Sequence, residues 1–362
     1  MKNRVKKIYR NLEKDVDVIV LANSTDPHLD MSFFYATGIT TGLFEGSVAF
    51  LHPDGDIDLL TSQLEEETAK KSGLPLTIFM TRKQLVKKLK MLLDGHRRIG
   101  INFEEITHHY ANRLKKLAPK AKLIDVSEGI RDARLTKDRE ELEILSKACR
   151  IASNAFVDLI PSIKKGKREV ELAAELVYLM MKRGANEVAF TTIVASGPNS
   201  AEAHYTAGSR KLQKGDLVVF DFGAKYKKYN SDITRTIVVG KASEKQKRMH
   251  SVVRRAQNAA LAKMRKGVKG STIDKAAREL IDSTEFKGKF VHSLGHSIGL
   301  ATHDGGGLGP VSKVTMRAGM VFTNEPGIYI SGYGGVRVED DVLITSTKPK
   351  LLTTASRELI EV

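Results

Sequence analysis

The first 125 residues alternate between short hydrophobic segments and longer segments in which apolar residues recur at helical spacing. Hydrophobic runs of this length are typical of β-strands, and the longer periodic segments are typical of amphipathic helices. Their alternation predicts an α/β layer, and a Gly/Asp-rich turn at 52–58 predicts a hairpin within a mixed sheet. Strands are expected at 16–22, 47–52, 57–61, 76–80, 97–101 and 122–126, and helices at 1–14, 62–72, 82–94 and 104–117.

A polar, charge-dense stretch at 127–143 separates this layer from the rest of the chain. It leads into a long helix that we expect to end near Ile160. A chain of 362 residues is long enough for two domains with substantial cores. We therefore predict an N-terminal domain at 1–127 and a C-terminal domain at 128–362.

The C-terminal part has a different order of elements, with glycine-rich strands near its end. Two hydrophobic segments, at 217–223 and 233–240, flank a middle rich in Lys, Tyr and Asn, a pattern that predicts an antiparallel hairpin. No sequence repeat of short fixed period is present. A further strand is expected at 191–196, and helices are expected at 167–184, 244–264 and 272–283.

The composition is that of a globular protein, with 41% hydrophobic and 28% charged residues. No apolar run reaches the roughly 18 residues that span a membrane. The basic N-terminus precedes an acidic, strand-like segment rather than the apolar core of a signal peptide, so we expect a cytoplasmic protein. A single cysteine, Cys149, excludes an intramolecular disulfide, and its helical surroundings favour a buried thiol over a nucleophile.

The net charge of +16 raises the question of a nucleic-acid partner. The basic residues are spread over several helices and are interleaved with acidic ones. Aromatic residues make up 6% of the chain and tryptophan is absent, so no stacking platform for bases is present. We therefore expect solvated basic faces rather than a nucleic-acid site.

Five side chains in the C-terminal part predict a site for two metal ions: Asp221, Asp232, His296, Glu325 and Glu339. Each lies beside apolar, strand-like residues or glycines. Together the four carboxylates and one neutral imidazole carry a formal charge of about −4, which is costly to bury unless cations offset it. Two-metal sites turn a shared water into a hydroxide near neutral pH. The pattern therefore predicts hydrolytic chemistry.

At these residues, and in motif order from about Arg131 onward, the chain resembles the pita-bread metallopeptidases. That family contains methionine aminopeptidase, aminopeptidase P and Xaa-Pro dipeptidase (prolidase). The long N-terminal region resembles the proline-specific branch, with prolidase as the nearest type. The resemblance implies an α/β domain of the creatinase/prolidase N-terminal type and an α+β pita-bread catalytic domain with two related halves. It also implies a homodimer in which the N-terminal domain of one subunit borders the other's cleft.

The resemblance also implies which residues hold the metals. The five residues named above match the ligand positions, and His296 is the first of two histidines at the family's spacing. Among three consecutive acids, Glu339 matches the Arg-x-Glu-Asp pattern, with Asp340 and Asp341 as second choices. A set rich in oxygen donors suits Mn²⁺ or Co²⁺, and Zn²⁺ and Fe²⁺ are alternatives.

Substrate-handling residues are implied in the same way. His204, His292, His303 and Arg337 match positions that contact the substrate, with Arg337 meeting its carboxylate or supporting the site. The implied reaction is attack of a metal-bridging hydroxide on the carbonyl of an X-Pro bond. His303 stabilises the oxyanion, and Glu325 carries a proton to the proline nitrogen.

Two departures from the family pattern leave the substrate open. Relatives often have His-Glu followed closely by proline where this chain has His303-Asp304 and three glycines, and they often have proline at the position of Ala203. X-Pro dipeptides are the expected substrates, and longer peptides cleaved by an aminopeptidase P activity are the alternative. A creatinase-like enzyme is disfavoured because that branch lacks the full ligand set. A metal-free binding protein on the same fold is the third possibility.

Overall fold

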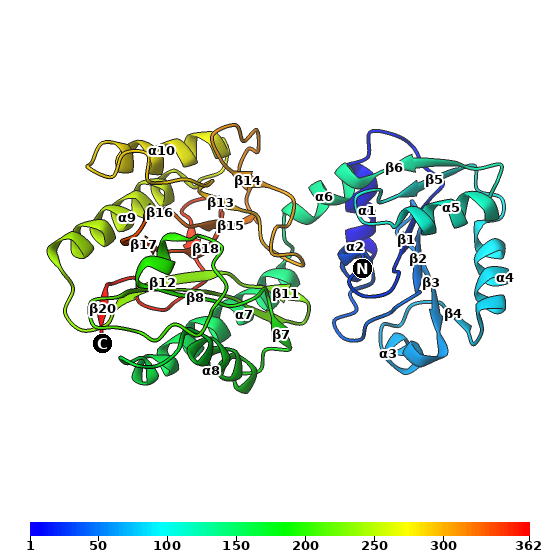
Figure 1. Ribbon diagram of the computed structural model, residues 1–362. Helices are drawn as coiled ribbons and strands as arrows, with labels where there is room; N and C mark the ends of the chain where they lie inside the picture. The colour runs from blue at the N-terminus through cyan, green and yellow to red at the C-terminus, as the bar shows by residue number, and fades with distance from the viewer. The chain divides into compact units, whose positions relative to one another are not determined.

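The computed structural model describes residues 1–362 and contains two compact units, Met1–Arg134 and Leu135–Val362 (Figure 1). Helix α6 (Ser127–Leu135) extends across the boundary that we predicted between residues 127 and 128. The polar stretch expected to separate the domains is therefore mostly helical. The two units meet near the end of α6.

The first unit is built on a six-stranded sheet in the order β4-β3-β2-β1-β5-β6. Strands β1–β2 and β2–β3 pair antiparallel, whereas β1–β5, β5–β6 and β3–β4 pair parallel. The predicted mixed sheet and its hairpin are thus confirmed. The strands are β1 (Val18–Ala22), β2 (Val48–Leu51), β3 (Ile57–Ser62), β4 (Leu76–Phe79), β5 (Arg98–Ile101) and β6 (Lys122–Asp125).

Helices α4 and α5 cover one face of this sheet, where Leu89 and Leu114 pack with Val20 in one core cluster. The predicted helix at 104–117 begins four residues late, because Thr107 accepts a hydrogen bond from the amide of Tyr110 and caps the helix there. Helix α2 was not predicted. The helices are α1 (Lys2–Arg10), α2 (Met31–Thr37), α3 (Glu66–Lys70), preceded by the 3₁₀ turn η1 (Gln63–Glu65), α4 (Arg82–Leu93) and α5 (His108–Leu117).

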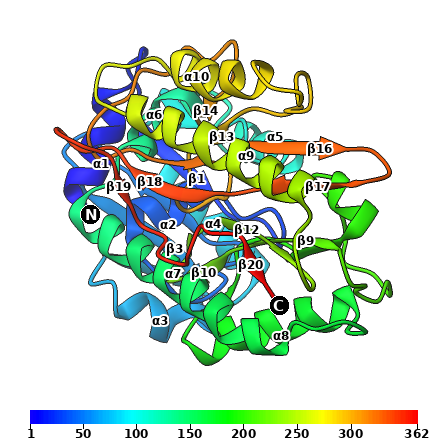
Figure 2. The same ribbon diagram turned by 90° about the vertical axis from the view of Figure 1, so that its left-hand side faces the viewer.

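The second unit begins with two helices that cover a four-stranded sheet in the order β20-β12-β9-β8 (Figure 2). Phe156 of α7 lies 5.6 Å, between ring centroids, from both Phe220 and Phe222 of β9, and these rings anchor the core of this half. The elements are α7 (Arg139–Leu159), η2 (Ile160–Ser162), α8 (Glu169–Lys182), β8 (Ile193–Ser196), η3 (Gly197–Ala201), β9 (Leu217–Phe222), β12 (Ile233–Val238) and β20 (Ile360–Glu361).

The hairpin predicted from 217–240 is present. Strands β9 and β12 pair antiparallel, with Asp221 opposite Thr234. Between them, the short strands β10 (Ala224–Tyr226) and β11 (Tyr229–Asn230) form the tip, and β10 also pairs with β7 (Glu187–Val188). The two tip residues, Lys227 and Lys228, have φ angles of 47° and 72°, the left-handed backbone that tight two-residue hairpin turns require.

The last strands of the unit lie between α9/α10 and α7/α8 (Figures 1 and 2). Val253 and Ile273 from the helices share a core cluster with Phe322 and Val342 from the strands. None of the helices combines the length and hydropathy needed to span a bilayer. The elements are α9 (Glu244–Lys263), α10 (Gly270–Asp282), β13 (Gly295–His296), β14 (Gly307–Leu308), β15 (Val321–Asn324), β16 (Gly327–Ile330), β17 (Gly334–Arg337), β18 (Asp340–Leu343) and β19 (Lys350–Leu351).

Candidate active site

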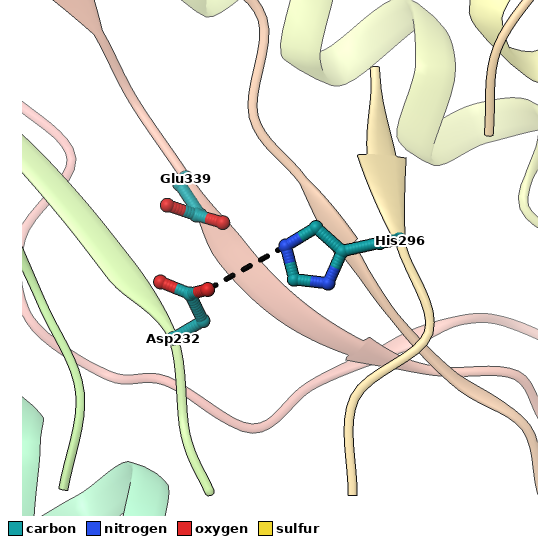
Figure 3. A group of neighbouring side chains, drawn as sticks. All are labelled: Asp232, His296 and Glu339. Carbon is teal, nitrogen blue, oxygen red and sulfur yellow. Dashed lines mark ion pairs between the residues drawn. The ribbon is translucent and has the colours of Figure 1, made fainter. Parts of the chain in front are cut away.

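The five predicted metal-binding residues come from different strands of the second unit. Asp221 lies in β9 and Asp232 directly precedes β12, while His296 ends β13. Glu325 and Glu339 lie at the junctions between β15 and β16 and between β17 and β18. The potential ligand atoms of Asp232, His296 and Glu339 all lie within 4.8 Å of one another (Figure 3). The fold therefore brings together side chains that are up to 107 residues apart.

His296 presents a lone pair to this cluster. Its Nδ1 lies 3.3 Å from the carbonyl oxygen of Ser297, which can only accept, so Nδ1 carries the proton. Burial and the neighbouring His303 lower the pKa of His296 to about 4, and the ring is neutral at pH 7. Nε2 then faces carboxylate oxygens of Asp232 and Glu325 at 3.6 and 3.5 Å. A backbone bond of this kind orients a histidine for metal binding.

The surrounding carboxylates are buried close to one another, which raises their pKa values. Burial, followed by the charge of Glu339, raises the pKa of Asp232, and burial followed by the charge of Glu325 raises the pKa of Glu339. The pKa of Glu325 rises to about 8, mainly through burial. Buried oxygens without a hydrogen-bond partner are Asp221 Oδ1, Asp232 Oδ1 and Glu339 Oε1. Acceptor atoms that face one another in this way fit a divalent cation between them.

The neighbouring acids Glu339 and Asp340 have different surroundings. Glu339 accepts one hydrogen bond at Oε2, from Thr234 Oγ1 at 2.6 Å, and its Oε1 has no partner. Asp340 instead accepts from Arg235 Nη2 at 2.7 Å and from Gln257 Nε2 at 2.9 Å. Only Glu339 of these two contributes to the cluster with His296.

Asp341 lies on the other side of the cluster. Its Oδ2 accepts a hydrogen bond from the Asp232 amide at 2.9 Å and from the thiol of Cys149 at 3.2 Å. Burial, followed by the charge of Asp341, raises the pKa of the Cys149 thiol well above its usual value. Cys149 is therefore a buried, protonated thiol, as the sequence predicted, that donates a hydrogen bond.

Arg337 links the metal-site residues to His292. Its guanidinium donates to the Asp221 carboxylate and to the hydroxyl of Tyr329, the latter at 2.6 Å. His292 Nδ1 lies 2.8 Å from the Ser293 carbonyl and must donate, so the Tyr329 hydroxyl donates to Nε2 at 2.8 Å. Burial lowers the pKa of His292 to about 4, which keeps this acceptor neutral. Tyr329 was not predicted from the sequence, and its local signal is its place in the Glu-Pro-Gly-Ile-Tyr segment.

These groups border a pocket of about 290 Å³. His204 and His303 are both exposed, and the His303 ring lies 4.2 Å from that of His296. Asp232 and Glu339 are only 5% and 1% exposed and are not part of the pocket lining. The lining consists of Ala203, His204, Asp221, His292, Ser293, Gly295, His296, His303, Gly307, Glu325 and Arg337.

The departure from the family pattern after His303 has a structural counterpart. Asp304 is buried and its Oδ2 lies 3.4 Å from Lys137 Nζ, which also lies 3.3 Å from Ser297 Oγ. A Cβ at Gly299 would come within 2.2 Å of the same carboxylate oxygen. The space available here is small, and the short aspartate fits it.

Two family models match the chain: the creatinase/prolidase N-terminal domain over residues 4–136, and metallopeptidase family M24 over residues 143–346. The Xaa-Pro dipeptidase of Pyrococcus horikoshii is 38% identical over 362 residues, which cover 99% of each chain.

Solved structures agree with this. The prolidase from Pyrococcus horikoshii OT3 superposes with a TM-score of 0.89 at 38% identity, over 99% of this chain and 100% of that one. The X-Pro aminopeptidase from Thermotoga maritima MSB8 superposes with a TM-score of 0.91 at 32% identity, over 98% and 99%. The chain therefore belongs to metallopeptidase family M24, as an enzyme with a creatinase-type N-terminal domain and a pita-bread catalytic domain.

Proposed function

We propose that this enzyme hydrolyses X-Pro peptide bonds, preferentially in dipeptides, with two divalent metal ions. The observation that carries the proposal is the group of buried carboxylates around a neutral His296, beside a pocket that contains three further histidines. Two relatives that match this chain over nearly its full length at 38% identity, both from Pyrococcus species, are named Xaa-Pro dipeptidase, and these names support the choice of substrate.

The metal ions would be held by the five predicted ligands: Asp221, Asp232, His296, Glu325 and Glu339. The unpartnered buried oxygens and the orientation of His296 support this assignment. The choice of Glu339 over Asp340 and Asp341 is supported by its place in the cluster with Asp232 and His296. Divalent ions supply Lewis-acid polarisation of a carbonyl and make water acidic enough to act as a nucleophile near neutral pH. The oxygen-rich donor set favours Mn²⁺ or Co²⁺ over Zn²⁺ or Fe²⁺.

The protein's own groups then handle protons and charge. Glu325 borders the pocket and accepts from Thr323 Oγ1 at 3.2 Å, and it takes the proton of the attacking water and passes it to the proline nitrogen. His303, exposed at the pocket, donates a hydrogen bond to the developing oxyanion. His204 contacts the substrate beside the scissile bond. A proline nitrogen offers no N–H, so recognition must come from such surrounding groups.

Arg337 and His292 act on the proline side. The guanidinium is 3% exposed and its nitrogens already donate to Asp221, Tyr329 and Thr234. This favours a supporting role for Arg337 over a direct contact with the substrate carboxylate. Arg337 holds the Tyr329 hydroxyl, and the hydrogen bonds from His292 to the Ser293 carbonyl and from Tyr329 to His292 keep His292 in a single tautomer at the pocket wall.

An X-Pro aminopeptidase activity on longer peptides is the second candidate. The likeness to the Thermotoga maritima enzyme supports it, because that protein carries this name and superposes over nearly the whole chain. A metal-free binding protein is disfavoured by the unpartnered carboxylate oxygens, which a structural core would satisfy within the chain.

One experiment separates these functions. The purified protein is analysed for bound metal, and proline release is then measured from Met-Pro and Gly-Pro with added Mn²⁺ or Co²⁺. Tripeptides of the X-Pro-Y type are assayed in parallel. A dipeptidase releases proline from the first set only, and an aminopeptidase cleaves the second. A metal-loaded protein that cleaves neither set would refute the proposal.

We also propose that the enzyme is a cytoplasmic homodimer in which residues 1–127 of one subunit border the other's cleft. The support is the family resemblance of the N-terminal region. Light scattering on the purified protein measures the mass directly, and a monomer of 40.0 kDa would contradict the dimer.

A further inference from the structure

His204 lies in a segment without helix or strand, between η3 and residue 209. Its imidazole is exposed at the pocket. The position of this ring therefore depends on how the backbone of the segment is held. A neighbouring side chain outside the segment holds this backbone.

Glu169, the first residue of α8, is that group. Its carboxylate is fully buried and accepts five hydrogen bonds from residues 196–208, which comprise the end of β8, η3 and the segment that carries His204. Oε1 accepts from Ser196 N at 2.8 Å, Ser196 Oγ at 2.6 Å and Asn199 Nδ2 at 3.1 Å, and Oε2 accepts from Tyr205 OH at 2.9 Å and Gly208 N at 3.2 Å. One carboxylate thus holds both ends of residues 196–208 and the residue next to His204.

The directions of these hydrogen bonds are determined by the chemistry of the donors. Asn199 Nδ2 also donates to the Tyr205 hydroxyl at 2.7 Å, so that hydroxyl uses its own hydrogen for Glu169. The backbone adds two bonds, from Glu169 N to Arg210 O and from Val170 N to Gly208 O, both at 3.0 Å. Every group around the Glu169 carboxylate donates a hydrogen bond. The position therefore requires a side chain with two terminal oxygens that both accept.

Residues 196–208 also receive hydrogen bonds from β17. Ser200 Oγ accepts from the amide of Gly335 at 2.8 Å, and Arg337 Nη1 lies 3.5 Å from the carbonyl of Ala203. Neither contact involves the residues that follow His204. The Tyr205–Glu169 bond is therefore the closest side-chain anchor on the C-terminal side of His204.

We propose that Glu169 is a positioning residue that sets the place of His204 in the pocket through Tyr205 and the backbone of residues 196–208. The inference rests on the proposed function, because His204 is there assigned a contact with the substrate. Glu169 does not line the pocket, so it acts on catalysis only through this segment. A displacement of about 1 Å in such a group costs up to roughly 100-fold in rate.

The test compares Glu169→Gln and Tyr205→Phe with wild type. Glutamine has the same shape but places an NH₂ group against donors, and phenylalanine removes only the hydroxyl. We expect kcat on an X-Pro dipeptide to fall about 10- to 100-fold in Glu169→Gln and several-fold in Tyr205→Phe, with metal content unchanged. The matched control is Glu171→Gln, an exposed carboxylate two residues further along α8 whose capping role glutamine can take over.

A double-mutant cycle distinguishes positioning from general damage. If Glu169 acts through His204, Glu169→Gln causes no further loss of kcat in a His204→Ala background. Losses that multiply would overturn the proposal, and so would a Glu169→Gln enzyme with wild-type kcat.

Hydrogen exchange supplies a readout that does not need activity. Amides in 196–208 should exchange faster in Glu169→Gln and Tyr205→Phe, while those in 297–307 keep their wild-type rates. Unchanged exchange in 196–208 would overturn the positioning role whatever the kinetics show. A wild-type protein that cleaves no X-Pro substrate would instead refute the proposed function, and the exchange rates would still decide whether Glu169 anchors the segment.

Discussion

The catalytic unit contains two neighbouring clusters of buried charged side chains. They differ in whether the chain itself provides partners for the carboxylates. In the first, Asp340 faces Arg235, which is 2% exposed, and both oxygens of Asp340 have donors within the chain. In the second, Asp232 and Glu339 face other carboxylates and an imidazole lone pair. We call these the Arg235–Asp340 cluster and the Asp232–Glu339 cluster.

This difference distinguishes buried carboxylates that stabilise the fold from those that we propose to bind metal. A buried carboxylate that serves the fold is matched by hydrogen-bond donors from the same chain, and Asp340 is matched by a cation as well, because an unmatched carboxylate would be costly to bury. The Asp232–Glu339 cluster leaves oxygens without partners although they are out of contact with water. The proposed metal ions would supply the positive charge that the chain itself does not place beside these carboxylates.

The largest expected effect is on catalysis. Asp232→Asn should lower X-Pro hydrolysis by about 1,000-fold or more, because an amide cannot replace an anionic ligand. The metal-free variant should unfold at the same or a higher temperature than metal-free wild type, since one repelling charge is gone. Kinetics, metal analysis and thermal unfolding measure these outcomes, with the exposed Asp158→Asn as control. Near-normal activity would remove Asp232 from the site.

Removal of a carboxylate charge from the Arg235–Asp340 cluster should destabilise the protein, unlike the same change at Asp232. Asp340→Asn leaves Arg235 buried without its counter-charge, and we expect the free energy of unfolding to fall by about 3 kcal/mol. Four carbonyl acceptors of Arg235 remain, which keeps the loss at the lower end of the usual range. Urea unfolding with and without metal measures it. An unchanged midpoint would show that the pair contributes nothing to the fold.

Removal of metal should make stability depend on pH. The pKa of Glu325 is raised to about 8 and that of Asp341 to about 7, so the folded chain keeps protons that the unfolded chain loses near pH 4. Stability from these groups is lost as pH rises through 7 and 8. The pKa values of His292 and His296 are lowered to about 4. These two groups make stability rise with pH, but only below about pH 6.5.

Chelated protein should therefore become less stable between pH 6.5 and 8, and metal-loaded protein should not. Thermal unfolding at four pH values in this range tests the expectation. Glu325→Gln should reduce the slope of the chelated protein, because one of the titrating groups is absent. A chelated wild type whose stability is flat or rising over this range would contradict the assigned cause.

The smallest effect is expected at the edge of the Asp232–Glu339 cluster. Cys149→Ala removes a donor to Asp341 and should lower the free energy of unfolding by about 1 kcal/mol, with activity retained within a few-fold. Iodoacetamide should leave folded wild type unmodified, because the thiol is buried and its pKa is raised. Rapid alkylation of the folded enzyme would mean that Cys149 is accessible.

Much of the fold was predictable because its strands are short, hydrophobic and bounded by turns. All six strands of the first unit and the β9–β12 hairpin follow from these patterns. Helix α2 was not predicted because six of its seven residues, Ser32–Thr37, are buried, so the helix has no polar face and no amphipathic pattern. The start of α5 was misplaced because the capping hydrogen bond of Thr107 outweighed the helical propensity of the residues before it.

The residue types of the candidate site could be predicted from the sequence, but the contacts between these residues could not. Motif spacing, not physical chemistry, selected Glu339 from three consecutive acids. The contacts that distinguish them come from Thr234, Arg235 and Asp232, more than 100 residues earlier in the chain. No local pattern indicates such partners. The same holds for Tyr329, whose importance lies in its contacts to Arg337 and His292.

The pairing of β15 with β18 sets a strict limit on changes in chain length. Thr323 lies opposite Asp341 and Asn324 opposite Asp340, and successive strand residues point to opposite sides. An insertion or deletion of one residue beside Glu339 would bring the wrong acid into the cavity and set another against Arg235. In a library of single-residue indels, the turn at 331–333 should tolerate changes that positions 338–340 do not.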